Sequence, residues 1–271
     1  MSQRCKIMGI LNVTPDSFSD GGRYDSLELA VRQAQRLMEQ GADILDIGGE
    51  STRPGAEEID VLEEIRRTVP VIAAIREATR DAEIGPVISI DTRKPEVAEA
   101  AIHAGADIWN DVTALTFSDR SEATASDLAC PVIIMHMQGS PETMQHSPRY
   151  DDAVRDVRDY LAKRLDALEF AGIERARVTI DPGLGFGKRQ EDNLAILREL
   201  AVFQDLGCPV LMGASRKSFI GRIDGSSADD RLGGSLAAAL WSLQAGADIL
   251  RVHDVAETVQ AVKVWEAINR G

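Results

Sequence analysis

The sequence is short of aromatic residues, cysteine and positive charge, and each shortage excludes a class of protein. Trp, Tyr and Phe make up 4% of the 271 residues, and the three cysteines, Cys5, Cys130 and Cys208, lie far apart. An odd number of cysteines without close spacing indicates neither a disulfide framework nor a zinc site. We therefore expect three small core residues and a reducing, cytoplasmic location.

Long apolar runs and a basic surface are also absent. No run of about 18 apolar residues occurs, so no membrane-spanning helix is expected. The start of the chain, MSQRCKIMGILNV, has too short an apolar stretch for a signal peptide. The formal net charge of −14 disfavours nucleic acid, which needs a basic face. A phosphate ligand would need a few local cations, backbone amides or a metal ion.

One short pattern recurs three times along the chain. It reads GADILDI at 41–47, GADIWND at 105–111 and GADILRV at 246–252. Each copy has a glycine at the end of a helical pattern, followed by a short apolar strand. This is the pattern expected where a helix leads into a strand of a repeated β/α unit, with glycine at the helix C-terminus.

Eight short apolar segments are typical of strands buried on both faces of a parallel sheet. They are 7–13, 43–48, 87–91, 107–110, 131–135, 178–181, 210–214 and 248–252. Helical patterns separate most of them, most clearly at 26–40 and 231–245. Eight alternations in a chain of this length predict a (β/α)₈ barrel. No linker-like composition interrupts the chain, so we predict a single domain over residues 1–271.

Two polar connections, 14–25 and 49–59, are too long to be simple turns. Both follow predicted strands, so both are expected on the C-terminal face of the barrel, where barrel enzymes place their sites. Long loops of this kind usually act as lids or binding loops.

Polar side chains follow most of the predicted strands and should converge on one space. They are Asn12, Asp91, Asn110, Asp111, His136, Asp181, Lys217, Arg251 and His253. We expect structural roles for Asp111, as a loop anchor, and for His136. The other acids and amides suit the donor edge of a flat heterocycle. Lys217, Arg251 and His253 offer cationic donors to an anion. Asn12 offers an oxygen ligand to Mg²⁺. The ring predicts a small, polar heteroaromatic ligand that carries a phosphate or diphosphate.

The segment GLGFGK at 183–188 is not a phosphate-binding loop, because its glycine spacing is wrong and no Ser or Thr follows its lysine. It is better interpreted as a flexible loop that presents Phe186 to the site.

These segments resemble the dihydropteroate synthase family, which sulfonamides inhibit. The matching blocks run in order along nearly the whole chain: GILNVTPDSFSDGG (9–22), DIGGESTRPGA (46–56), SIDTRKPEVA (89–98), NDV (110–112), MHMQGSPETMQ (135–145), IDPGLGFGK (180–188), SRKSFIG (215–221) and RVHDV (251–255). Two mild departures occur: Trp109 stands where a smaller aliphatic residue is expected, and Leu184 replaces a more usual aromatic residue.

The resemblance implies a transferase of the (β/α)₈ fold. It joins 6-hydroxymethyl-7,8-dihydropterin diphosphate to 4-aminobenzoate and releases diphosphate, with Mg²⁺ as cofactor. By position, the pterin pocket corresponds to Asp91, Asn110, Asp181 and Lys217, and the Mg²⁺ ligand corresponds to Asn12. The diphosphate contacts correspond to Arg251 and His253, with Thr52 and Arg53 from the second loop. The aminobenzoate pocket corresponds to Phe186, Lys217 and Ser218. The catalytic residues implied are Asn12, Asp91, Lys217, Arg251 and His253.

The chemistry suits such residues. The electron-rich pterin ring can stabilise positive charge on the carbon that loses diphosphate, so cleavage of the C–O bond can run ahead of attack. Closure of the 14–22 segment over the bound substrate would keep water from that carbon. We therefore expect this segment to be disordered or displaced when no ligand is bound.

Two alternatives stay open at this stage. A pterin-dependent methyltransferase would share the barrel and the acidic pocket but would not use a diphosphate clamp. A non-catalytic pterin-binding paralogue would not need Asn12, Arg251 or His253. The resembling family usually forms homodimers, and Val259, Val262 and Trp265 could form that surface or pack on the barrel.

Overall fold

The computed structural model describes residues 4–14, 23–51, 58–82, 85–140, 143–145 and 147–269. Its strands are β1 (Lys6–Asn12), β2 (Ile44–Gly48), β3 (Val87–Asp91), β4 (Ile108–Asp111), β5 (Val132–Met135), β6 (Val178–Asp181), β7 (Leu211–Met212) and β8 (Ile249–Val252). These bounds agree with the eight segments expected from the sequence, except that β7 has only two residues.

The strands form one parallel sheet that closes into a barrel. Their order is β6-β5-β4-β3-β2-β1-β8-β7, and every ladder is parallel. A single parallel bridge from Ile180 to Val210 joins β6 to the start of β7. There the Ile180 amide donates to the carbonyl of Pro209 at 2.9 Å. The (β/α)₈ barrel expected from the sequence is confirmed.

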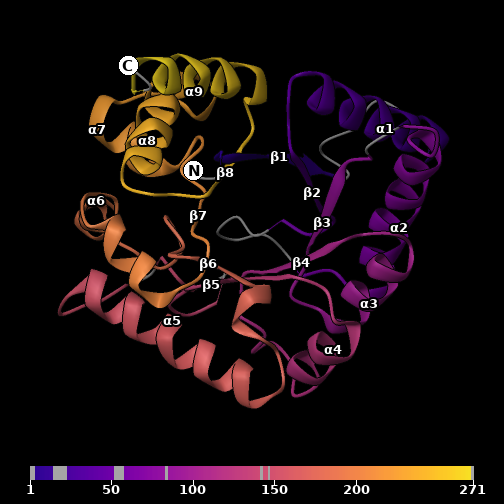
Figure 1. Cartoon of the computed structure of the whole chain (residues 1–271), viewed down its shortest axis with the longest axis horizontal. Coiled ribbons are helices and arrows are strands. Elements are labelled where there is room, and N and C mark those ends of the chain that lie inside the picture. The colour runs from indigo at the N-terminus through magenta and orange to yellow at the C-terminus, as the bar shows by residue number, and fades with distance from the viewer. Residues whose placement is uncertain are drawn as a thin grey trace.

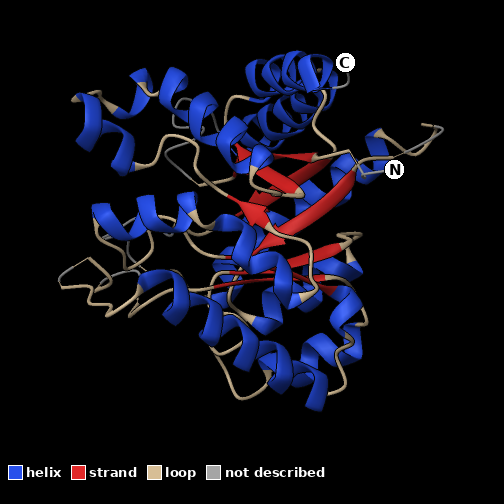
Figure 2. Cartoon of the chain, turned by 60° about the vertical axis from the view of Figure 1, so that its left-hand side comes forward, coloured by secondary structure: helices blue, strands red, loops and turns tan. Residues whose placement is uncertain are grey.

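The helices surround the strands in chain order (Figure 1). They are α1 (Arg23–Glu39), α2 (Val61–Ala78), α3 (Pro95–His103), α4 (Ser121–Leu128), α5 (Ala153–Phe170), α6 (Gln190–Arg198), α7 (Ser218–Asp224), α8 (Leu232–Gln244) and α9 (Val255–Asn269). Figure 2 shows the strands enclosed between them. None of the helices in the described residues is long and apolar enough to cross a membrane.

Each copy of the repeated GAD pattern ends a helix with the same local hydrogen bonds. Gly41, Gly105 and Gly246 have positive φ, and each ends its helix in the same way. At the first copy the Gly41 amide donates to the Met38 carbonyl and the Ala42 amide to the Leu37 carbonyl. This pair of bonds is the Schellman motif, which satisfies carbonyls at a helix end.

The aspartate of the pattern fixes the strand that follows. The carboxylates of Asp43, Asp107 and Asp248 accept from the amides of Ile7, Ile88 and Val210 at 2.8, 2.7 and 2.8 Å. Each bond joins the start of one strand to the start of its neighbour. The N-terminal end of the barrel is thereby held in register at three places.

The barrel interior changes from apolar to polar along the strands. Its lower layer is a cluster of Met8, Ile44, Ile108, Ile133, Leu211 and Ile249. Side chains two residues further along a strand point to the same side. Asp46, Asn110 and Arg251 each lie two residues beyond a member of this layer. Polar groups are therefore placed directly above an apolar floor, on the C-terminal face.

Several expectations about the periphery can now be compared with the fold. Most of the 14–25 and 49–59 connections, including the 14–22 lid expected to be displaced, lies outside the described residues. Val259 and Val262 on α9 are buried in the core, so they pack on the barrel rather than form a free surface. All three cysteines are buried free thiols.

Candidate functional site

Arg251 joins two carboxylates at the centre of the barrel mouth. Its Nε donates to Asp46 Oδ2 and its Nη2 donates to Asp91 Oδ2, each at 2.6 Å. Asp46 is fully buried, and the Asp91 side chain is 12% exposed. Short, charge-assisted bonds of this kind fix a planar guanidinium firmly.

The neighbouring strands bring two amides to the same level. Asn12, Gly48, Asp91 and Asn110 lie in register across β1 to β4. Asn110 Nδ2 donates to both oxygens of Asp46 at 3.3 Å. A Cβ built on Gly48 would lie 3.6 Å from Asp91 Oδ2 and 3.8 Å from Asn12 Oδ1. The Asn12 and Asp91 side chains therefore both lie beside Gly48.

Burial and mutual repulsion set the charge states here. Burial raises the pKa of Asp91 although Arg251 opposes it, and Asp46 raises it further. For Arg251, burial lowers the pKa, but Asp46 and Asp91 outweigh that effect and the net shift is upward. The guanidinium stays charged, and an approaching anion meets a fixed cation.

Asp181, Lys217 and Phe186 form the opposite wall. Asp181 ends β6 and accepts from the Gly183 amide at 2.7 Å. The Lys217 ammonium lies over the Phe186 ring, 4.1 Å from its centroid. Burial lowers the pKa of Lys217 to about 8, although the Asp181 carboxylate acts to raise it. Burial raises the pKa of Asp181, opposed by the Gly183 amide and then by Lys217.

His253 was expected to be a cation, but the structure indicates a neutral side chain. Burial, with Arg251 and Arg216 nearby, lowers its pKa to about 4, so the imidazole is neutral at pH 7. The Oγ of Ser215 accepts from the His253 amide at 3.2 Å and lies 3.1 Å from Nδ1. Because the hydroxyl can still donate to Nδ1, this arrangement favours the tautomer with its proton on Nε2. His253 therefore offers a neutral donor.

The remaining predicted residues fall in different places. Ser218 is exposed at the first position of α7, next to Lys217. Thr52 and Arg53 lie outside the described residues. Asp111 anchors its own loop by accepting from the amides of Thr113 and Leu115 at 2.7 and 2.9 Å, as expected.

Two residues that were not singled out from the sequence are central to this site. Asp46 looked like part of a buried strand, and its partner Arg251 is 205 residues away. Lys188 was assigned to a flexible loop, but it is 1% exposed and tied to the backbone of 183–187. The expectation of a flexible loop is wrong. The lysine that ends GLGFGK is the feature of the sequence that could have indicated a buried, hydrogen-bonded turn.

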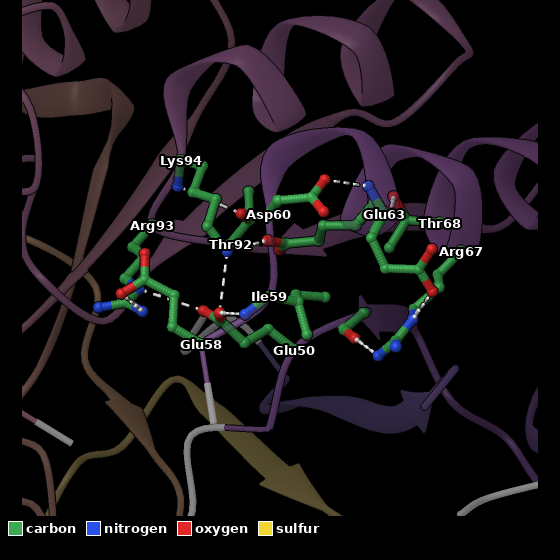
Figure 3. A network of polar contacts seen from close by, with 12 residues as sticks. Glu50, Glu58, Ile59, Asp60, Glu63, Arg67, Thr68, Thr92, Arg93 and Lys94 are labelled. Atoms are coloured by element: carbon green, nitrogen blue, oxygen red, sulfur yellow. Dashed lines mark hydrogen bonds and ion pairs between the residues drawn. The ribbon is translucent and has the colours of Figure 1, made fainter. Parts of the chain in front are cut away.

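A network of buried charges supports the ends of β2 and β3 (Figure 3). The Lys94 ammonium donates to Glu50 at 2.8 Å and to Glu64 at 2.6 Å. Glu50 also accepts from Arg93 and from the Ile59 amide, each at 3.1 Å. Glu50 therefore joins the segment after β2 to the chain that enters α2.

The pKa shifts in this network follow from its geometry. Burial acts to raise the pKa of Glu50, but hydrogen bonds from Lys94, Ile59 and Arg93 outweigh it and hold the pKa below its usual value. Glu64 is fully buried, and burial raises its pKa despite the bond from Lys94. Lys94, with a 2% exposed side chain, is the cation that both carboxyls share.

The donor set limits what this mouth can bind. No group of three or more His, Cys, Asp and Glu side chains in the described ranges could hold a metal ion by itself. The available groups are carboxyl and amide oxygens on one side and Lys, Arg and neutral His donors on the other. They suit a polar heterocycle with an anionic tail, and an oxygen-loving cation that keeps water or ligand oxygens.

Comparison with known proteins places this mouth in a family context. The family model for pterin binding enzymes matches residues 8–253. The dihydropteroate synthase of Escherichia coli K12 is 47% identical over 261 residues, which cover 96% of this chain and 90% of that protein.

Solved structures agree with the sequence comparison. A Xanthomonas albilineans dihydropteroate synthase with 4-aminobenzoic acid is 48% identical, with a TM-score of 0.91 over 99% of this chain and 94% of that one. The same organism's enzyme in complex with 7,8-dihydropteroate is 46% identical, with a TM-score of 0.88 over 99% and 95% of the two chains.

We predict that Lys94→Met destabilises the protein by about 3–5 kcal/mol, because two buried carboxyls lose their shared cation. Urea denaturation followed by circular dichroism measures the change. The matched control is Lys163→Met on α5, where the lysine is exposed and the expected change is within about 0.5 kcal/mol. Adding Glu64→Gln to Lys94→Met should recover part of the loss. Equal stability of Lys94→Met and Lys163→Met would contradict the role given to this network.

Proposed function

The chain belongs to the pterin-binding enzymes and, among them, to the dihydropteroate synthases, and on this premise we propose a function for its barrel mouth. The mouth condenses 6-hydroxymethyl-7,8-dihydropterin diphosphate with 4-aminobenzoate. The products are 7,8-dihydropteroate and diphosphate. The observation that carries the proposal is the layer in which Arg251 bridges Asp46 and Asp91 above an apolar floor. It supplies acceptors for a pterin ring beside donors for its diphosphate.

The pterin ring fits the buried acids and amides. Its ring and amino N–H groups are donors, and carboxylates are acceptors with directional lone pairs. Asp181 is 8% exposed and keeps an oxygen for such a donor while the other accepts from Gly183. The Asn110 amide offers both a donor and an acceptor, which suits the edge of the pterin ring that carries both donors and acceptors. The apolar floor below excludes water from the face of the heterocycle.

The diphosphate fits the cationic side of the mouth. Among the described residues, Arg251 spends two of its five N–H groups on Asp46 and Asp91, so donors remain for an anion. The Nε2–H of neutral His253 adds a further donor. Donors placed where negative charge develops lower the barrier to departure of the leaving group.

Mg²⁺ remains part of the proposal. The Oδ1 of Asn12 and Oδ2 of Asp91 both lie beside Gly48, and such hard oxygen donors suit this cation, which takes few protein ligands. Asn12 would hold it, with substrate phosphate oxygens completing the shell. When bound, it supplies charge neutralisation for the departing diphosphate.

The second substrate fits the wall of Phe186, Lys217 and Ser218. The aryl ring can pack on Phe186, and the Lys217 cation can pair with its carboxylate. The arylamine is neutral at pH 7 and already has a lone pair, so it needs no strong base before attack. Exclusion of water then matters more than base strength, since a carbon with positive character reacts with any nucleophile.

The assembly and the compartment complete the proposal. A homodimer is supported by an apolar groove of about 350 Å³ between α6, α7 and α8, lined by Leu197, Phe219, Ile223 and Trp241. Trp241 is 54% and Ile223 63% exposed, which a second copy would cover. A reducing cytoplasm is supported by the buried free thiols.

The proposed function predicts release of diphosphate only when both substrates and Mg²⁺ are present. A coupled diphosphate assay with each component omitted in turn measures this dependence. Transfer of a methyl group from a folate to a corrinoid, without diphosphate release, would favour the methyltransferase alternative. Pterin binding without turnover would favour a non-catalytic paralogue.

Asp181→Asn should weaken binding of the pterin substrate by about tenfold to a hundredfold, because an acceptor is replaced by a donor that faces donors. The amide oxygen can still accept from the Gly183 amide, so the fold should persist. Isothermal titration calorimetry gives the affinity, and Asp205→Asn, at an exposed position, is the matched control. An unchanged affinity would remove Asp181 from the pterin pocket.

The pKa of Lys217 predicts that kcat/KM for 4-aminobenzoate depends on pH. Because burial lowers its pKa to about 8, it is charged below that pH and neutral above it. We therefore expect kcat/KM for 4-aminobenzoate to fall as the pH rises through about 8. Lys217→Arg should remove the fall, since a guanidinium stays charged.

Lys217→Ala should raise the KM of both substrates, because the side chain contacts the shared wall of the two subsites. A loss confined to 4-aminobenzoate would refute the shared role. A pH profile in Lys217→Arg that still falls near pH 8 would assign the titration to another group.

A further inference from the structure

Lys188 is a buried cation that the proposed reaction does not use. Its ammonium donates to the carbonyls of Gly183 at 2.8 Å, Phe186 at 3.1 Å and His136 at 3.3 Å. It also lies 2.9 Å from His136 Nδ1. Burial lowers the pKa of His136 to about 3, so the ring is neutral and can accept from the ammonium.

The segment around Lys188 has no spare room. Gly183, Gly185 and Gly187 all have positive φ. A Cβ built on Gly183 would lie 2.0 Å from the His136 carbonyl oxygen, and one on Gly187 would lie 2.4 Å from the Gln138 carbonyl oxygen. The backbone of 183–187 is therefore pressed against the chain that follows β5.

Other side chains tie the same backbone from outside. The Gly185 carbonyl accepts from Gln145 at 2.6 Å, and the Gly185 amide donates to Asn193 at 2.7 Å. The Tyr150 hydroxyl donates to the Gly187 carbonyl at 2.6 Å. These bonds come from residues 145 and 150 and from α6, whereas Lys188 lies at the end of the 183–187 segment itself.

The ammonium holds together groups that repel one another. Three carbonyl oxygens point at one place, and the Gly183 carbonyl also accepts from the Phe186 amide at 3.1 Å. Without the cation the carbonyls of Phe186 and His136 would lose this donor, which costs free energy at a buried acceptor. Burial lowers the pKa of Lys188 to about 7, with Asp181 and Asp192 acting to raise it and Lys217 to lower it. Burial therefore disfavours the charged form of Lys188, and the three carbonyls and the Asp181 carboxylate offset part of that cost.

The turn formed by residues 183–187 shapes the wall of the site. Phe186 lies in it, with its ring beneath the Lys217 ammonium. A Cβ built on Gly185 would lie 3.2 Å from Lys217 Cδ, so the turn also packs along the stem of that lysine. A shift of this backbone would move the Phe186 ring relative to the Lys217 ammonium.

We propose that Lys188 is a positioning residue for the arylamine substrate: its ammonium gathers the carbonyls of Gly183, Phe186 and His136 and so sets Phe186 against Lys217. Lys188 contacts no substrate itself. The inference rests on the proposed function, in which Phe186 and Lys217 form the 4-aminobenzoate wall.

Lys188→Met tests the inference, because methionine fills a similar volume without charge or donors. The KM for 4-aminobenzoate should rise about tenfold, which corresponds to about 1.4 kcal/mol of lost binding. Affinity for the pterin substrate, measured by calorimetry without 4-aminobenzoate, should change less than about threefold, since Lys217 and Arg251 still act on Asp181 when the charge of Lys188 is removed. Hydrogen exchange of the amides in 183–187 should become faster.

Two further variants keep the test decisive. Lys163→Met is the matched control at an exposed lysine and should change none of these measurements. Tyr150→Phe removes one outer tie to Gly187 and should raise the same KM by a smaller factor. If Lys188→Met does not fold, Tyr150→Phe decides the outcome.

The results separate two kinds of failure. An inactive wild-type protein would refute the proposed function, and hydrogen exchange would still decide whether Lys188 orders the turn. An active wild type with an unchanged KM for 4-aminobenzoate in the variants, or with equal losses for both substrates, would overturn the positioning role.

Discussion

The pairing of Arg251 with Asp46 and Asp91 is the interaction on which the rest of the barrel mouth depends. It joins β8 to β2 and β3 across the interior, directly above the apolar layer. A buried ion pair contributes little net stability, but loss of one partner leaves an uncompensated charge. The three residues therefore act as a unit. Their arrangement explains how a chain with a net charge of −14 can present a cation to an anionic ligand.

Around this unit, further cations hold the chain after several of the strands. Lys94 holds Glu50 behind β2 and β3, and Lys188 holds the turn after β6. After β7, Arg216 has a positive φ and pairs with Asp254 at 2.5 Å. Lys188 satisfies backbone carbonyls, whereas Lys94 and Arg216 satisfy carboxylates of neighbouring segments. The precision of the mouth comes from this outer layer as much as from the side chains that face the ligand.

The sequence was enough to predict the barrel, because both of its signals are local. The expected apolar segments of four to seven residues and the glycine of each GAD copy depend on neighbours a few positions away. The role of the GAD aspartates was missed, since each bonds to a strand 19 to 38 residues earlier. Asp46 was missed because its partners lie 64 and 205 residues away. Charge states escaped as well: neutral His253 follows from burial among cations, which composition does not reveal.

The same pairing also accounts for how an occupied arginine can serve a ligand. Arg251 satisfies Asp46 and Asp91, and the pKa of Asp91 is raised because burial outweighs the attraction of Arg251. On the proposed function, the pterin ring brings donors to the carboxylates and the diphosphate brings acceptors to Arg251. Every charge then gains a partner as another is released, so substrate binding exchanges pairs rather than creating unpaired charges. Such an exchange keeps desolvation small while still placing the cation beside the bond that breaks.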